Sequence, residues 1–168
     1  MKGQLERIEI SAILSNLKAK ITKKQEFINE QKLLQGENII TSDHPSIIHF
    51  SVNKAATQYV KKILARCVAQ NQMLHIQMNE YAFCSSLPYL DHLNEIGMRN
   101  YQHVFQPQGF LYSAFGGFIE GIDNLEAYKI LLLIRDPRDV LVSSFFSTAY
   151  SHPLPGSTRL CHLQKLWQ

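Results

Sequence analysis

The sequence predicts an α/β fold in which helices flank a parallel β-sheet. Hydrophobic residues make up 45% of the 168 residues, enough for one domain with a sizeable core. Residues 46–51 form a short run of strand length that is followed by a tight loop and a helical pattern. Residues 128–134 form a nearly continuous apolar run, as expected for a central parallel strand covered on both faces. Ligands of such sheets bind beyond the carboxyl ends of the strands, so we expect the functional residues there.

The N-terminal part is predicted to be an amphipathic helix. No Pro or Gly occurs from Gln4 to about Leu34, and apolar residues recur at helical spacing, at Ile10, Leu14, Leu17, Ile21 and Ile28. Lys24 falls on the same stripe, which favours packing on the chain's own domain over a long coiled coil. The alternative is that this helix is an interaction module that binds a partner. We divide the chain into an N-terminal helical segment, residues 1–40, and an α/β domain, residues 41–168.

The remaining elements follow in a regular order. After the turn at Ser42-Asp43-His44-Pro45, the patterns predict a strand at 46–51, a helix to about Gln70, a weak strand at 73–78, a helix at 89–96, a strand at 109–115, a short turn at 124–128, a strand at 128–134 and a helix to about Ala149. Gly116-Gly117 ends the third strand, and Pro153 and Pro155 stop the last helix. Strands that alternate with helices are typical of parallel sheets.

Composition excludes several classes of function. The 17 basic and 14 acidic residues give a net charge of +3, too weak a bias to indicate a nucleic-acid partner. The three cysteines show no metal-ligand spacing, so the sequence indicates neither a disulfide framework nor a zinc site, and we expect no metal. No apolar stretch reaches the ~18 residues that a membrane span requires, and there is no signal-peptide pattern. We therefore expect a cytoplasmic protein, of unknown oligomeric state.

The first strand-loop-helix unit has the components of an anion site. A helix begins near Thr57, and its N-terminus offers backbone N–H groups and the positive end of the helix dipole. Lys54 lies in the loop, and the small residues Ala55 and Ala56 allow an anion to approach the backbone. No GxxxxGK[ST] loop is present, which disfavours a nucleoside triphosphatase. For Lys54 alone, a solvated loop lysine is the plainer interpretation.

The second unit places a cation directly after the apolar run 128–134. Arg135 suits a dianionic phosphate, and Ser143, a little over two helical turns later, can add a hydroxyl donor. Asp136 is a candidate N-cap, with Pro137 at the first helical position. The plainer alternative is that Arg135 pairs with Asp136 or Asp139 and that Ser143 packs the helix.

These two units resemble the sulfotransferases that use 3′-phosphoadenosine 5′-phosphosulfate (PAPS). The first resembles the family's PKSGTTW-type loop: Lys54 and Thr57 match, and the other positions are variants, within Asn53-Lys54-Ala55-Ala56-Thr57-Gln58-Tyr59. The second closely resembles the family's RxPxDxxxS motif, over Arg135-Asp136-Pro137-Arg138-Asp139-Val140-Leu141-Val142-Ser143. The similar region covers roughly residues 46–150.

The resemblance implies a P-loop-like sulfotransferase fold with PAPS as co-substrate and a hydroxyl or amine acceptor that the sequence does not identify. It implies that Lys54 acts in catalysis and that the 5′-phosphosulfate binds the residues Lys54, Ala55, Ala56, Thr57, Gln58 and Tyr59. It also implies that Arg135 and Ser143 hold the 3′-phosphate. No metal is implied.

The general base is not evident, because the family's usual histidine position corresponds to Ala114. Glu120 is the nearest carboxylate, so we take it as the candidate catalytic base, and His49, His103 and His152 are candidates only if folding brings them near. Family members usually continue with a glycine- and lysine-containing segment that closes over the nucleotide, so we expect an incomplete C-terminal part. The alternative is a non-catalytic or partner-completed nucleotide-binding remnant of the same fold.

Overall fold

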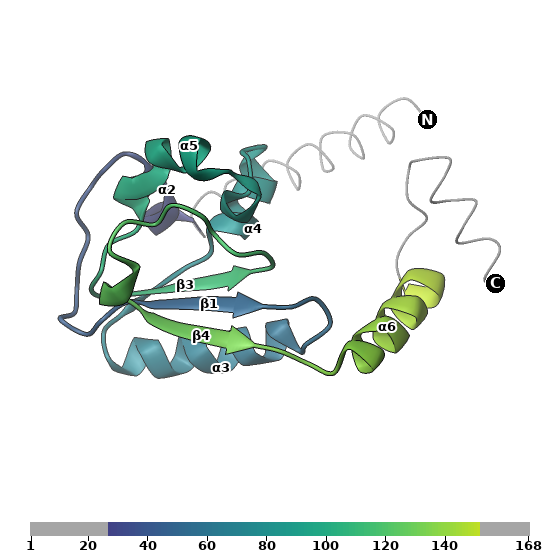
Figure 1. Cartoon of the computed structure of the whole chain (residues 1–168). Helices are drawn as coiled ribbons and strands as arrows, with labels where there is room; N and C mark the ends of the chain where they lie inside the picture. Colours follow the sequence, from purple (N-terminus) through teal and green to yellow (C-terminus); the bar gives the residue numbers. More distant parts are fainter. Residues whose placement is uncertain (1–26, 152–168) are drawn as a thin grey trace, which may run out of the picture.

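A four-stranded parallel sheet forms the centre of the computed structural model, which describes residues 27–151 (Figure 1). The strands run in the order β2-β3-β1-β4, and every pairing between neighbours is parallel. Their bounds are Ile47–Ser51 for β1, Leu74–Ile76 for β2, Phe110–Phe115 for β3 and Lys129–Leu133 for β4. The expected α/β class, with helices flanking a parallel sheet, is confirmed.

Helices pack on both faces of the sheet. The long helix α3, Thr57–Gln70, places Leu64 and Val68 against Leu111 of β3. The main core lies on the other face, where β1 contributes Ile48 and Phe50. The helices α2 (Ile28–Leu34) and α5 (Glu95–Met98) contribute to this core, as do the 3₁₀ turns η1 (Leu90–His92) and η2 (Arg99–Val104). Alternate residues of β1 therefore face opposite layers, as the pleat of a strand requires.

Most of the predicted strands and the helix after β1 are confirmed within a residue or two. The predicted N-terminal helix falls largely on residues 1–26, which lie outside the described part, and α2 coincides with its last predicted residues. Leu33 of α2 is fully buried in the main core. Within residues 27–151, no helix is both long enough and apolar enough to cross a membrane.

The middle of the chain differs from the prediction of one helix at 89–96. Helix α4, Met78–Ser85, comes earlier, and its inward side consists of only two buried residues, Met78 and Ala82. Such a narrow apolar stripe gives a weak helical period. Around 89–96 the chain forms the 3₁₀ turn η1 and then begins the short helix α5, because the Asn94 side chain accepts a hydrogen bond from Gly97 N at 2.9 Å and caps that new helix.

The expectation that residues 128–134 form a covered central strand is wrong for the described part. β4 pairs only with β1 and lies at the edge of the sheet, and its apolar side chains are exposed, 47% for Ile130 and 61% for Leu132. Helix α6, Pro137–Phe146, lies beyond the carboxyl end of β4 rather than over the sheet (Figure 1). Apolar composition predicts a strand, but the place of that strand depends on elements elsewhere in the chain.

Candidate functional site

The loop between β1 and α3 adopts a strained backbone. Lys54 and Ala56 have φ angles of 63° and 59°, in the left-handed region that favours glycine. Val52 N donates to Leu133 O of β4 at 3.1 Å, and Ala55 N donates to Val52 O at 3.3 Å. The loop therefore turns tightly at the carboxyl end of β1, next to the end of β4.

The N-terminus of α3 closes this loop without a side-chain cap. Ala56 is the N-cap residue and has no side-chain acceptor, and the first turn contains no acidic residue. The Thr57 hydroxyl instead lies 2.5 Å from the Ser51 hydroxyl. The first N–H groups of a helix have no partner within the helix, so this end of α3 presents donors and a positive dipole end to an anion.

Lys54 reaches across to the segment that follows α6. Its Nζ donates to Ser147 Oγ at 2.6 Å. Ser147 begins the π-helical turn η4, Ser147–Ser151, and was not predicted as a site residue. The available signal was its spacing, because Ser147 follows Ser143 by four residues and so falls on the same side of the helix.

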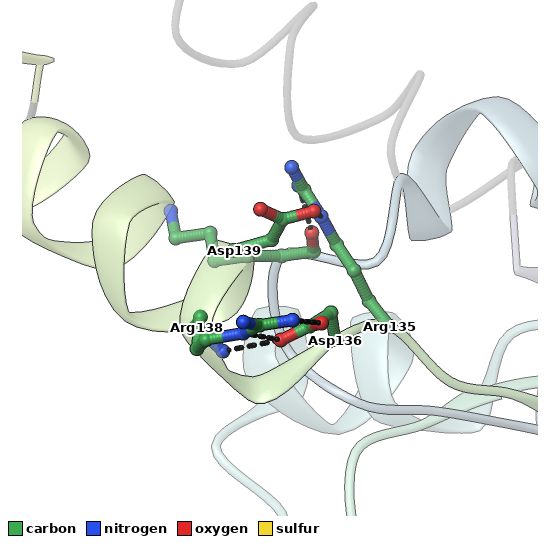
Figure 2. Close-up of polar contacts among 5 residues, drawn as sticks. Arg135, Asp136, Arg138 and Asp139 are labelled. Carbon is green, nitrogen blue, oxygen red and sulfur yellow. Dashed lines mark hydrogen bonds and ion pairs between the residues drawn. The ribbon is translucent and has the colours of Figure 1, made fainter.

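The loop after β4 forms the predicted N-cap. Asp136 accepts a hydrogen bond from Arg138 N at 2.9 Å, and Pro137 takes the first helical position. The side chain of Asp136 also pairs with Arg138, whose NH2 lies 2.7 Å from Asp136 Oδ2 (Figure 2). This hydrogen-bonded guanidinium lowers the pKa of Asp136. Arg138 thus contributes to the N-terminus of α6 through its pairing with Asp136.

Arg135 connects the two loops. Its NH1 donates to Lys54 O at 2.8 Å, and its Nε lies 3.5 Å from Asp139 Oδ2 (Figure 2). The plainer interpretation of Arg135 is therefore partly observed, since it does pair with Asp139. A guanidinium carries five N–H donors, however, and these contacts use only the NH1 and Nε sides of the fork. The structure brings the two motifs into direct contact.

The other site residues predicted from sequence lie less close together. Ser143 is half-buried in α6, and no described hydrogen bond joins its side chain to Arg135. Gln58 and Tyr59 are exposed in the first turn of α3, with Tyr59 70% exposed. Glu120 is exposed in the loop after β3. Within the described residues, the contacts that define the site thus centre on Lys54, Arg135 and the α3 N-terminus.

A cavity of about 680 Å³ adjoins the loop between β1 and α3. Asn53, the residue before Lys54, lines it together with Gly116 and Gly117, which follow β3. The Asp91 carboxylate holds this glycine pair, accepting from Gly116 N at 2.8 Å and from Gly117 N at 3.0 Å. Sequence analysis missed Asp91, because nothing in the local pattern connects it with glycines 25 residues away.

The histidines that were candidate bases lie elsewhere. His49 is fully buried on the α3 side of β1, and burial, followed by the charge of Lys61, lowers its pKa. His103 is exposed, with Nε2 3.1 Å from Leu34 O. His152 lies outside the described residues. His92, which the prediction did not include, lines the 680 Å³ cavity.

A partly buried group of polar side chains lies between α3 and its neighbours, apart from the loops. Lys61 of α3 pairs with Glu80 of α4, and the side chain of His75 in β2 hydrogen-bonds Ser113 of β3. Burial, followed by the charge of Lys61, lowers the pKa of His75 to about 4. In the described part of the chain, no group of three His, Cys, Asp or Glu side chains is placed to hold a metal ion.

Comparisons with known proteins identify no relative. No family model matches the sequence, and no significantly similar protein was found among the curated proteins or the solved structures. Any functional assignment therefore depends on the two loops and their contact.

Proposed function

We propose that this chain binds PAPS and transfers its sulfuryl group to a hydroxyl or amine acceptor, on a P-loop-like sulfotransferase fold. The observation that carries the proposal is the hydrogen bond from Arg135 NH1 to Lys54 O. It joins two sequence motifs, separated by 81 residues, at the carboxyl edge of the neighbouring parallel strands β1 and β4. In open α/β sheets, ligands usually bind in the crevice beyond the carboxyl ends of neighbouring strands.

The two loops suit the two ends of a bisphosphorylated nucleotide. The uncapped N-terminus of α3, with Lys54, offers backbone donors and a cation to the 5′-phosphosulfate. Arg135 is 40% exposed in its side chain, and its remaining guanidinium donors match the 3′-phosphate, with Ser143 on the following helix. A 3′-phosphate distinguishes this donor from ATP.

In the proposed reaction the acceptor oxygen or nitrogen forms a bond to sulfur, and the bond from sulfur to the 5′-phosphate oxygen breaks. The electron pair of that bond leaves on 3′,5′-bisphosphoadenosine, and the acceptor gives up a proton. Lys54 stabilises the negative charge that grows on the leaving phosphate, and one positioned donor of this kind typically lowers the barrier by about 3 kcal/mol. The hydrogen bond to Ser147 orients Lys54 beside the loop.

A non-catalytic or partner-completed binding domain is the second candidate, and two observations favour it. Ala114, at the end of β3, has no titratable side chain where the family resemblance implies a base. β4 is exposed at the sheet edge among the described residues. Incubation with ³⁵S-labelled PAPS separates the candidates, because only the enzyme releases label to an acceptor or to water faster than the Lys54→Ala variant.

Binding is tested first by calorimetric titration with 3′,5′-bisphosphoadenosine, 5′-AMP and ATP. We compare the native chain with Arg135→Ala and with Arg138→Ala, a matched control three residues later, in the first turn of α6, whose side chain is 88% exposed. Hydrogen bonds to charged groups are worth about 1.5–3 kcal/mol, so we expect Arg135→Ala to weaken binding of the bisphosphate at least tenfold. Arg138→Ala should leave it within about threefold, since exposed ion pairs contribute little.

The same titrations contain the outcomes that would refute the proposal. Equal affinity for the bisphosphate and 5′-AMP would remove the 3′-phosphate site. Equal losses in the two arginine variants would show that Arg135 has no specific contact with the ligand. Circular dichroism of both variants shows whether a loss of binding reflects a loss of fold.

A further inference from the structure

The cavity beside the phosphate loop has the size and the walls of a small-molecule site. Its volume of about 680 Å³ lies within the range typical of ligand pockets. Three aromatic residues, Phe27, Phe83 and Tyr89, line it, and Phe83 is 74% exposed. An exposed aromatic ring at a cavity wall is suited to pack against an apolar or aromatic body.

The charged side chains of the lining are acidic. Glu80 and Asp91 contribute to it, whereas none of the lining residues in the described part is a lysine or an arginine. Lys61 offsets the charge of Glu80, but the described partners of the Asp91 carboxylate are neutral: two glycine N–H groups and Asn79 Nδ2 at 3.0 Å. The cavity wall therefore keeps a net negative charge.

Two acceptor atoms among the lining residues have unused hydrogen-bonding capacity. Glu80 Oε2 and Asn79 Oδ1 are buried, and neither has a hydrogen-bond partner within residues 27–151. Because these two atoms expose no surface to the cavity, the groups open to a ligand are the remaining acceptor positions of the lining carboxylates, Asp91 and Glu80. A carboxylate or phosphate ligand has only acceptors and would meet like charge.

We propose that this cavity binds the acceptor substrate, and that the acceptor is an amine carried on an aromatic or apolar body. This proposal rests on the function proposed above. Asn53 and the Gly116-Gly117 pair line the cavity, so it lies at the same edge of the sheet as Lys54. The ammonium group pairs with the lining carboxylates of Asp91 and Glu80, and the ring packs against Phe83.

The test uses three probes that share one body. The full chain is titrated with 2-phenylethylamine, 2-phenylethanol and 3-phenylpropanoate, without nucleotide and at low salt, where exposed charges are least screened. We expect the amine to bind at least about tenfold more tightly than the alcohol, in line with the strength of charge-assisted hydrogen bonds. The carboxylate should show no measurable binding.

Variants locate the binding. Glu80→Gln should weaken amine binding about tenfold and leave the alcohol unchanged, whereas Glu95→Gln, an exposed glutamate outside the lining, should change neither. Because Glu80 also pairs with Lys61, a second variant guards against misfolding: Phe83→Ala should weaken the amine and the alcohol to a similar extent.

The outcomes separate this inference from the proposed function. Similar affinity for all three probes, or an amine affinity that Phe83→Ala leaves unchanged, overturns the amine site. Bisphosphate binding without amine binding overturns the amine site and leaves the nucleotide site standing. Amine binding without bisphosphate binding keeps a ligand cavity but overturns its role as an acceptor site.

Discussion

Replacing Ala56 with glycine tests whether the loop after β1 holds backbone strain. Ala56 has a φ of 59°, and the left-handed conformation costs a residue with a Cβ roughly 1–2 kcal/mol, whereas glycine adopts it freely. Glycine also loses more chain entropy on folding, which offsets about 0.4–1 kcal/mol of that gain. We therefore expect Ala56→Gly to raise the free energy of unfolding by roughly 0.5–1 kcal/mol.

The matched control is Ala65→Gly in the interior of α3, Thr57–Gln70. There the same chemical change removes a good helix former and should lower the free energy of unfolding by about 1 kcal/mol. The two variants thus shift the urea midpoint, followed by circular dichroism, in opposite directions. If Ala56→Gly destabilises the chain as much as Ala65→Gly does, the loop is not strained at this position and the reasoning fails.

Three further predictions concern partly buried polar groups. Lys61→Met should lower the free energy of unfolding by about 1–3 kcal/mol by leaving the half-buried Glu80 unpaired, and Lys61→Met combined with Glu80→Gln should recover part of that loss in urea titrations. Stability should fall as the pH drops from about 6.5 toward 4, because unfolded His75 binds a proton that the folded chain, with the pKa of His75 at about 4, does not. The loss is at most about 3 kcal/mol before solvent screening lowers it, and His75→Gln should flatten this dependence; an unchanged slope would contradict the assignment. Asp91→Ala should cost about 2–3 kcal/mol through its three lost hydrogen bonds, and a change below 0.5 kcal/mol would show that the glycine turn holds its shape without the carboxylate.

Local patterns predicted the elements whose own residues show a clear composition or period. β1 and β3 follow from their β-branched and aromatic runs, and α3 follows from its apolar spacing. Helix α4 was not predicted, because it buries only Met78 and Ala82, and two residues are too few to give a helical period of apolar residues. The exposed position of β4 was not predictable from its own composition, since a strand's neighbours come from other parts of the chain.

The part of the candidate site that consists of charged side chains could be predicted from the sequence. Lys54 and Arg135 each follow a strand, and parallel strands end at one edge, so their proximity follows from topology. The contact itself uses the backbone carbonyl of Lys54, which has no sequence signal. The Asp91 carboxylate and the Glu80 oxygen lining the cavity were missed for a related reason, because their roles depend on tertiary neighbours.

Positive and negative side chains lie in separate regions along the carboxyl edge of the sheet. For the two proposed substrates, this separation favours different binding places. The loops after β1 and β4 present Lys54 and Arg135, while the adjoining cavity presents Glu80 and Asp91. An anionic nucleotide is attracted to the first region and repelled by the second, and a cationic amine experiences the opposite. If the proposed function holds, each ligand is directed to its own end of the edge, because the charges that attract one substrate repel the other. Salt weakens both effects together, so rising ionic strength should reduce nucleotide and amine affinity in parallel.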